Sequence, residues 1–169
     1  MKDLWSPFRM HLAAAFDDRC GYGAMYEPSG TVDHVKPVST HEALAYEWQN
    51  YRYVSGWINS AKSKSGEVLD PCSVKAGWFK ILLPSLQLVA VEANIPQRFR
   101  RRALDTVQNL HLAHDERILR QRREWLAQYD SGAITLTALR RFAPLIAEAV
   151  EERDAAAAAA QLAAGGAPL

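Results

Sequence analysis

Residues 31–39 read Thr-Val-Asp-His-Val-Lys-Pro-Val-Ser, residues 46–50 read Tyr-Glu-Trp-Gln-Asn, and residues 58–62 read Ile-Asn-Ser-Ala-Lys. The first stretch favours a strand that closes at Pro37, because proline has no N–H for a sheet and disfavours helix at the residue before it. Upstream, the turn signal Glu27-Pro-Ser-Gly30 predicts a hairpin.

The hairpin strands are expected at residues 22–26 and 30–35. Downstream, residues 43–50 are expected to be irregular or a single helical turn. Apolar residues then recur at spacings of three and four, which predicts a helix over residues 51–63 that ends at Gly66. The predicted order is therefore strand, strand, loop and helix.

The remaining elements follow from the same patterns. A helix is predicted within residues 5–16, two short strands within residues 77–91, and helices at about residues 96–110, 115–129 and 135–153. The Ala- and Gly-rich tail from Asp154 is expected to be a frayed helix end followed by disorder. We therefore expect the α+β class, with domains at residues 1–91 and 92–153 and a tail at residues 154–169.

The amino-acid composition excludes several kinds of protein. The chain has 169 residues, 49% of them hydrophobic, and a net charge of +1 that is unevenly distributed. Residues 1–60 carry 5 basic and 7 acidic side chains, whereas residues 61–125 carry 12 and 7. Two cysteines exclude a disulfide framework. With no apolar run long enough for a membrane span, we expect a reduced, cytoplasmic protein that binds no membrane.

The three stretches together resemble the HNH (ββα-metal) endonuclease family. That family's pattern is Asp-His followed by Pro, then an Asn after an aromatic-containing segment, and finally an Asn or His with a Lys three residues later on a helix. The resemblance covers roughly residues 19–71. An Asn-to-Asn spacing like that of Asn50 and Asn59 also occurs in the zinc-free HNH domains of RNA-guided nucleases.

The resemblance implies a role for each residue of the pattern. His34 would be the general base, and Asn50 would fix the loop and orient the His34 imidazole. Asp33 and Asn59 would hold the catalytic metal. A site with two protein oxygen ligands favours Mg²⁺ or Mn²⁺ over zinc. The implied reaction is hydrolysis of phosphodiester bonds, which needs an activated water and relief of charge at phosphorus.

The sequence departs from the commoner family members at a structural zinc site. Many HNH proteins hold this zinc with two Cys-x-x-Cys pairs. Here Cys20 is retained, but Gly23 stands in its partner's place, and Ser55 and Ile58 occupy the second pair. We therefore expect no structural zinc.

Basic residues supply candidates for contacts with nucleic acid, DNA rather than RNA. Lys62 lies one helical turn beyond Asn59 and could contact a phosphate. The remaining candidates are Lys36, Arg98, Arg101 and Arg102. For the arginines, a face paired with nearby acidic residues is an equally good interpretation.

Each residue also has a purely structural interpretation when it is taken singly. Asp33 and His34 could cap a strand end, Asn50 could cap a helix, and Asn59 with Lys62 could form an exposed helix face. On the whole chain, the alternatives to an endonuclease are a catalytically silent nucleic-acid-binding module and a partner-binding protein that uses its C-terminal helices, as a hetero- or homo-oligomer. A role as effector of bacterial defence or of a mobile element rests on family analogy alone.

Overall fold

The computed structural model describes residues 3–63 and 67–165, and it belongs to the α+β class. The helices are α1 (Arg9–Ala15), α2 (Gly56–Lys62), α3 (Gln97–Asn109), α4 (Glu116–Asp130), α5 (Leu136–Phe142) and α6 (Pro144–Gly165). The strands are β1 (Thr31–His34), β2 (Tyr51–Val54), β3 (Phe79–Leu82) and β4 (Gln87–Ala90). They form two separate antiparallel pairs, β1–β2 and β3–β4.

The partner strand of β1 differs from the prediction. β1 pairs with β2, with Asp33 opposite Arg52 and His34 opposite Tyr51. The expected first strand, residues 22–26, is not a strand; that segment contributes only an isolated bridge between Arg19 and Tyr26. The loop between β1 and β2 contains two single turns of 3-10 helix, Glu42–Leu44 and Trp48–Asn50, which confirms the prediction for residues 43–50.

The helix predicted over residues 51–63 is wrong in its first third. Tyr51 and Tyr53 pack on the cluster around α1, so alternate residues of this segment face opposite sides of the sheet, as in a strand. Because β2 is buried on both faces and leads directly into a helix, its apolar residues imitate helical spacing. The helix itself starts at Gly56 and ends at Lys62, and the predicted stop at Gly66 lies outside the described residues.

The C-terminal half largely follows the prediction. β3 and β4 fall within the segment expected to hold two short strands, and α3 and α4 match two of the three predicted helices. The third is two helices, because Pro144 cannot continue the hydrogen-bond ladder of α5. The helix expected to end near Asp154 continues as α6 to Gly165, and residues 166–169 of the tail lie outside the described part of the chain.

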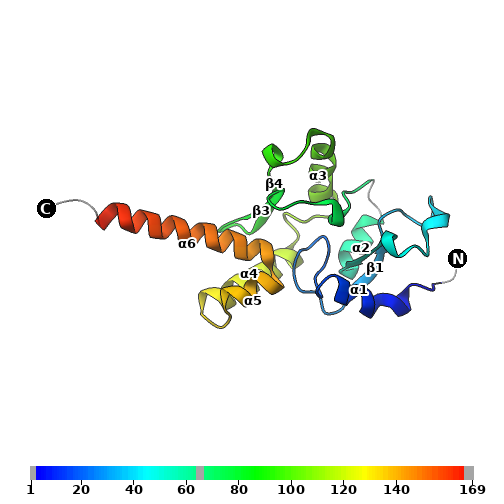
Figure 1. Cartoon of the computed structure of the whole chain (residues 1–169), viewed down its shortest axis with the longest axis horizontal. Helices are drawn as coiled ribbons and strands as arrows, with labels where there is room; N and C mark the ends of the chain where they lie inside the picture. Colours follow the sequence, from blue (N-terminus) through cyan, green and yellow to red (C-terminus); the bar gives the residue numbers. More distant parts are fainter. Residues whose placement is uncertain (1–2, 64–66, 166–169) are drawn as a thin grey trace.

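A continuous core joins the two halves of the chain. One buried cluster contains Val54 and Ile58 from β2 and α2, Leu88 from β4, Ile118 from α4 and Ile146 from α6. Residues on both sides of the expected boundary at residue 91 thus contribute to one core. Figure 1 shows α1, β1 and α2 at one end of the molecule and α6 projecting from the other. No helix among the described residues has the length and apolar character needed to cross a bilayer.

Candidate active site

His34 ends β1 with its imidazole held on three sides. Nε2 lies 2.9 Å from the carbonyl oxygen of Ala45. Because a carbonyl can only accept a hydrogen bond, Nε2 is the donor in this contact. The rings of Trp5 and Tyr51 meet the imidazole edge-on, with centroids 4.6 and 5.1 Å away. These contacts thus fix the orientation of the ring, with Nε2 toward the Ala45 carbonyl.

Asn50 holds the loop that carries the Ala45 carbonyl. Its buried amide accepts from the N–H of Lys36 at 2.7 Å and donates to the carbonyls of Lys36 and Leu44 at 3.1 and 3.0 Å. Leu44 immediately precedes Ala45, so the structure connects Asn50 to the imidazole through the loop backbone. Tyr51 adds to this arrangement, because its hydroxyl donates to the same Ala45 carbonyl at 3.0 Å.

Asp33 faces the opposite side of the sheet from His34, toward α2. The ammonium of Lys62 donates to Asp33 Oδ1 at 2.9 Å and also to the backbone carbonyl of His34. The Asp33 side chain is 4% exposed and that of Lys62 is 8% exposed. Burial outweighs the attraction of Lys62 and leaves the pKa of Asp33 above its ordinary value. Lys62 is therefore a buried partner of the Asp33-His34 pair, and the expectation that it reaches a phosphate is corrected.

Asn59 projects from α2 toward β1. Its amide nitrogen donates to Thr31 Oγ1 at 3.0 Å and to the carbonyl of Val32 at 3.4 Å, both on the strand residues before Asp33. With the nitrogen engaged by the strand, the carboxamide oxygen Oδ1 remains the group that can bind a metal. The structure therefore places Asp33, Asn59 and Lys62 between the same strand and the same helix.

The donors in this region suit a hard divalent cation. Asp33 Oδ2 is buried and has no hydrogen-bond partner among the described residues, so no protein donor competes for this carboxylate oxygen there. Mg²⁺ and Mn²⁺ favour such oxygen ligands and complete their shells with water and phosphate. Lys62 is a competing cation on the other carboxylate oxygen, and its ammonium would have to share Asp33 with the metal.

Sequence reasoning missed a second, partly buried ion pair on the same face as Asp33. Arg52 lies opposite Asp33 in the β1–β2 pair. Its guanidinium donates two hydrogen bonds, of 2.8 and 2.7 Å, to the carboxylate of Asp70. Burial raises the pKa of Asp70, but the bonds from Arg52 and from the N–H of Cys72 hold it below its ordinary value. A single arginine between two tyrosines was the available signal, because it marks a charged side chain on the inner face of a strand.

The four positions compared with zinc ligands in the sequence, Cys20, Gly23, Ser55 and Ile58, lie together. Cys20 Sγ accepts hydrogen bonds from the N–H of Gly23 at 3.3 Å and from the N–H and hydroxyl of Ser55 at 3.4 and 3.3 Å. A Cβ atom built on Gly23 would lie 3.4 Å from Cys20 Sγ and 3.8 Å from Cδ1 of Ile58. Two short segments 35 residues apart thus meet at these four residues.

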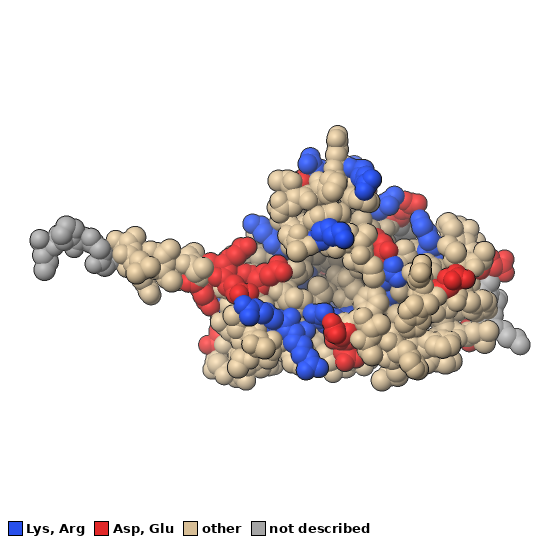
Figure 2. Space-filling view, in the orientation of Figure 1, with Lys and Arg blue, Asp and Glu red and all other residues tan. Residues whose placement is uncertain are grey.

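The basic residues proposed for nucleic-acid contact are dispersed. Arg101 pairs with Asp105 on its own helix, and Arg102 pairs with Glu67. Arg98 lies over the ring of Phe99, with its guanidinium carbon 4.8 Å from the centroid, and Lys36 is exposed. Figure 2 shows basic side chains scattered among acidic ones on this face, with acidic residues gathered where α6 leaves the body. Paired arginines are thus the better interpretation of much of this region.

Comparison with protein-family models, with curated proteins and with solved structures found no match to this chain.

Proposed function

We propose that this protein is a metal-dependent endonuclease with an HNH-like ββα site, which hydrolyses phosphodiester bonds in nucleic acid, DNA in preference to RNA. The observation that carries the proposal is the arrangement of the Asp33 carboxylate and the His34 imidazole at the end of β1. The His34 imidazole is held by the Ala45 carbonyl through Nε2, and the adjacent carboxylate keeps a buried oxygen without a partner.

His34 would act as the general base. Nδ1 would take a proton from the water that attacks phosphorus, and the Ala45 carbonyl would stabilise the proton already on Nε2 as the ring becomes positively charged. Asp33 and Asn59 would hold a divalent ion, which supplies Lewis-acid stabilisation of charge on the phosphate and the leaving oxygen. Asn50 would keep the loop in place so that the imidazole retains this orientation.

The cluster around Cys20 gives independent support for the HNH-like architecture. In the resemblance, these four positions belong together only because they bind one zinc ion in other family members. Gly23, Ser55 and Ile58 cannot supply thiolates, yet their backbone and side-chain positions still converge on Cys20. Proximity without the metal is expected if hydrogen bonds and apolar packing have taken over the role of zinc.

We expect the purified protein to contain no stoichiometric zinc, and the triple variant Gly23→Cys, Ser55→Cys, Ile58→Cys to bind one zinc ion per chain. The new side chain at position 23 would make ordinary contacts, and four thiolates suit tetrahedral zinc. Elemental analysis after gel filtration measures the content. Adding Cys20→Ala to the triple variant provides the control, which should bind zinc far more weakly. A triple variant that takes up no zinc would contradict the proposed relation of the four positions.

We expect Asn59→Ala to lower activity mainly by weakening metal binding. Part of the loss should be recovered at high Mg²⁺ or with Mn²⁺, because the amide oxygen is one of two protein ligands. The fold should survive, since Asn59 is only partly buried. The matched control is Ser60→Ala, whose hydroxyl bonds only the Gly56 carbonyl of the same helix. Full activity with parent-like metal dependence would show that Asn59 is not a ligand.

One observation favours a second candidate, a nucleic-acid-binding module without catalysis. Asp33 is enclosed and its Oδ1 already has a cationic partner in Lys62, so the carboxylate is neutralised without a metal. The two candidates differ in metal binding. Incubation with duplex DNA, single-stranded DNA and RNA, with and without Mg²⁺, tests the endonuclease; binding without metal-dependent cleavage of any substrate would favour the second candidate.

A further inference from the structure

Exposed apolar side chains gather on two short segments of the described chain that meet at His34. Six of the nine large hydrophobic side chains that are exposed among the described residues belong to these segments. One segment is the approach to α1 and its start, with Leu4, Phe8 and Met10; the other is the loop between β1 and β2, with Leu44, Tyr46 and Trp48. Scattered apolar side chains need no explanation, but a group of this kind marks a binding surface.

Aromatic rings connect both segments to the His34 imidazole. Trp5 contacts His34, and its ring centroid lies 5.9 Å from that of Tyr46. Tyr51 also contacts His34, and its ring centroid lies 6.1 Å from that of Trp48. Trp48 is therefore one ring removed from the imidazole, and it is 46% exposed. In Figure 1 the loop, in cyan, lies at the outer edge of the molecule, at the end away from α6.

The two segments offer little charge attraction to a phosphate backbone. Residues 3–8 and 37–51 contain no lysine or arginine, whereas Asp3, Glu42 and Glu47 are acidic. Attraction of nucleic acid by basic side chains therefore acts from outside these segments. The part of a nucleotide that an exposed indole binds well is its uncharged base, because every base has a flat π face.

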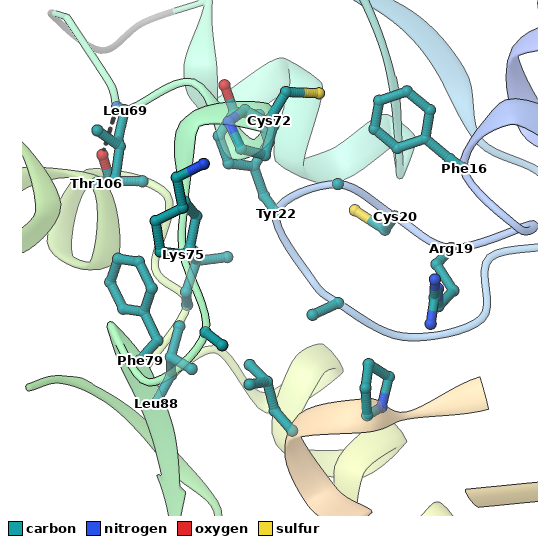
Figure 3. Close-up of a pocket in the computed structure, with 18 of the residues that line it drawn as sticks. Phe16, Arg19, Cys20, Tyr22, Leu69, Cys72, Lys75, Phe79, Leu88 and Thr106 are labelled. Atoms are coloured by element: carbon teal, nitrogen blue, oxygen red, sulfur yellow. Dashed lines mark hydrogen bonds between the residues drawn. The ribbon is translucent and has the colours of Figure 1, made fainter. Parts of the chain in front are cut away.

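The cavity drawn in Figure 3 is a separate feature of the molecule. It has a volume of about 680 Å³, and Tyr22, Cys72 and Phe79 are among the residues that line it. Neither His34 nor Trp48 lines it. A substrate that reaches His34 past Trp48 therefore lies over the exposed loop rather than inside this cavity.

We propose that Trp48 stacks on an unpaired base of the substrate strand next to the phosphate at His34, so that the substrate class of this site is nucleic acid with unpaired nucleotides. The inference rests on the proposed function for the reaction at His34. In a duplex both faces of a base are covered by its neighbours, so the base must leave the stack before an indole can contact it. Single strands and mismatched pairs release a base at the lowest cost.

The first test measures binding in EDTA, where no metal-dependent cleavage occurs. The probes are fluorescently labelled oligothymidylate and an abasic strand of the same length, which keeps the phosphates and lacks the bases. Trp48→Ala should weaken binding of oligothymidylate about tenfold and that of the abasic strand less than about twofold, and Trp48→Phe should restore most of the loss. Equal losses on the two probes, or no loss on oligothymidylate, would overturn the inference.

Leu104→Ala is the matched control, because Leu104 is a 40% exposed apolar residue of α3 outside the two segments. This variant should bind both probes like the parent. Light scattering after gel filtration tests the other occupant of an apolar surface, a second copy of the chain. A parent dimer that Trp48→Ala converts to a monomer would assign the surface to self-association and overturn the inference.

Cleavage with Mg²⁺ separates this inference from the proposed function. The parent should cut a duplex that contains a mismatch faster than the fully paired duplex, and Trp48→Ala should lose most of that difference. A parent that cuts both, with an unchanged preference in Trp48→Ala, would overturn the inference alone. A parent that binds oligothymidylate through Trp48 but cuts no substrate would instead refute the proposed function.

Discussion

His34→Ala should lose metal-dependent cleavage, with a fall of roughly a hundredfold to ten-thousandfold in rate. The loss removes the only base that the proposed mechanism uses. Because the missing group accepts a proton and binds no metal, neither high Mg²⁺ nor Mn²⁺ should restore activity, in contrast to Asn59→Ala. Single-turnover cleavage of a labelled duplex measures the rate.

The matched control for this prediction is His41→Ala. His41 is an exposed histidine of the same loop, and its ring contacts the hydroxyl of Thr40. Its removal should leave the rate within about twofold of the parent, by the usual tolerance of exposed sites. Equal rates for His34→Ala and the parent would show that the general base lies elsewhere.

Lys62→Met should destabilise the fold by about 3–5 kcal/mol, because it leaves the buried Asp33 carboxylate without its cation. Replacing both partners, with Asp33→Leu added, should recover most of that stability, since no buried charge then remains. Urea denaturation monitored by circular dichroism measures the three free energies of unfolding. A Lys62→Met protein as stable as the parent would contradict the buried pair.

The destabilisation of Lys62→Met should shrink on acidification. Burial already raises the pKa of Asp33 above its ordinary value, and loss of Lys62 removes a contact that lowers it. A carboxyl whose folded-state pKa exceeds its unfolded value binds its proton more tightly in the folded state. Stability therefore rises as pH falls through the folded-state pKa toward the unfolded one. Repeating the denaturation at neutral and mildly acidic pH checks the sign, and a deficit that grows in acid would contradict it.

The fold was predictable where one physical signal dominated. Pro37 lies beyond the end of β1, and the separation of β3 from β4 by the turn around Pro84 matched the expected pair of short strands. The β2 strand was not predictable in the same way. Tyr51 and Val54 fit helical spacing, but in β2 they face opposite sides of a strand that is buried on both faces, and only pairing with β1 reveals this.

The candidate site shows the same division. The candidate residues Asp33, His34, Asn50 and Asn59 could be chosen from their order in the sequence. The structure places all four around β1, the loop after it and α2. The contact between the Ala45 carbonyl and His34 could not be predicted, because every residue has a backbone carbonyl whatever its side chain.

The most direct test is digestion of supercoiled plasmid by the purified 169-residue chain with Mg²⁺, with EDTA, and with EDTA followed by excess Mg²⁺. Parent protein should cut in the first and third conditions and not in the second, and Asp33→Ala should cut poorly in all three. Cleavage that persists in EDTA, or that is equal in the parent and Asp33→Ala, would contradict a metal-dependent site at Asp33 and His34.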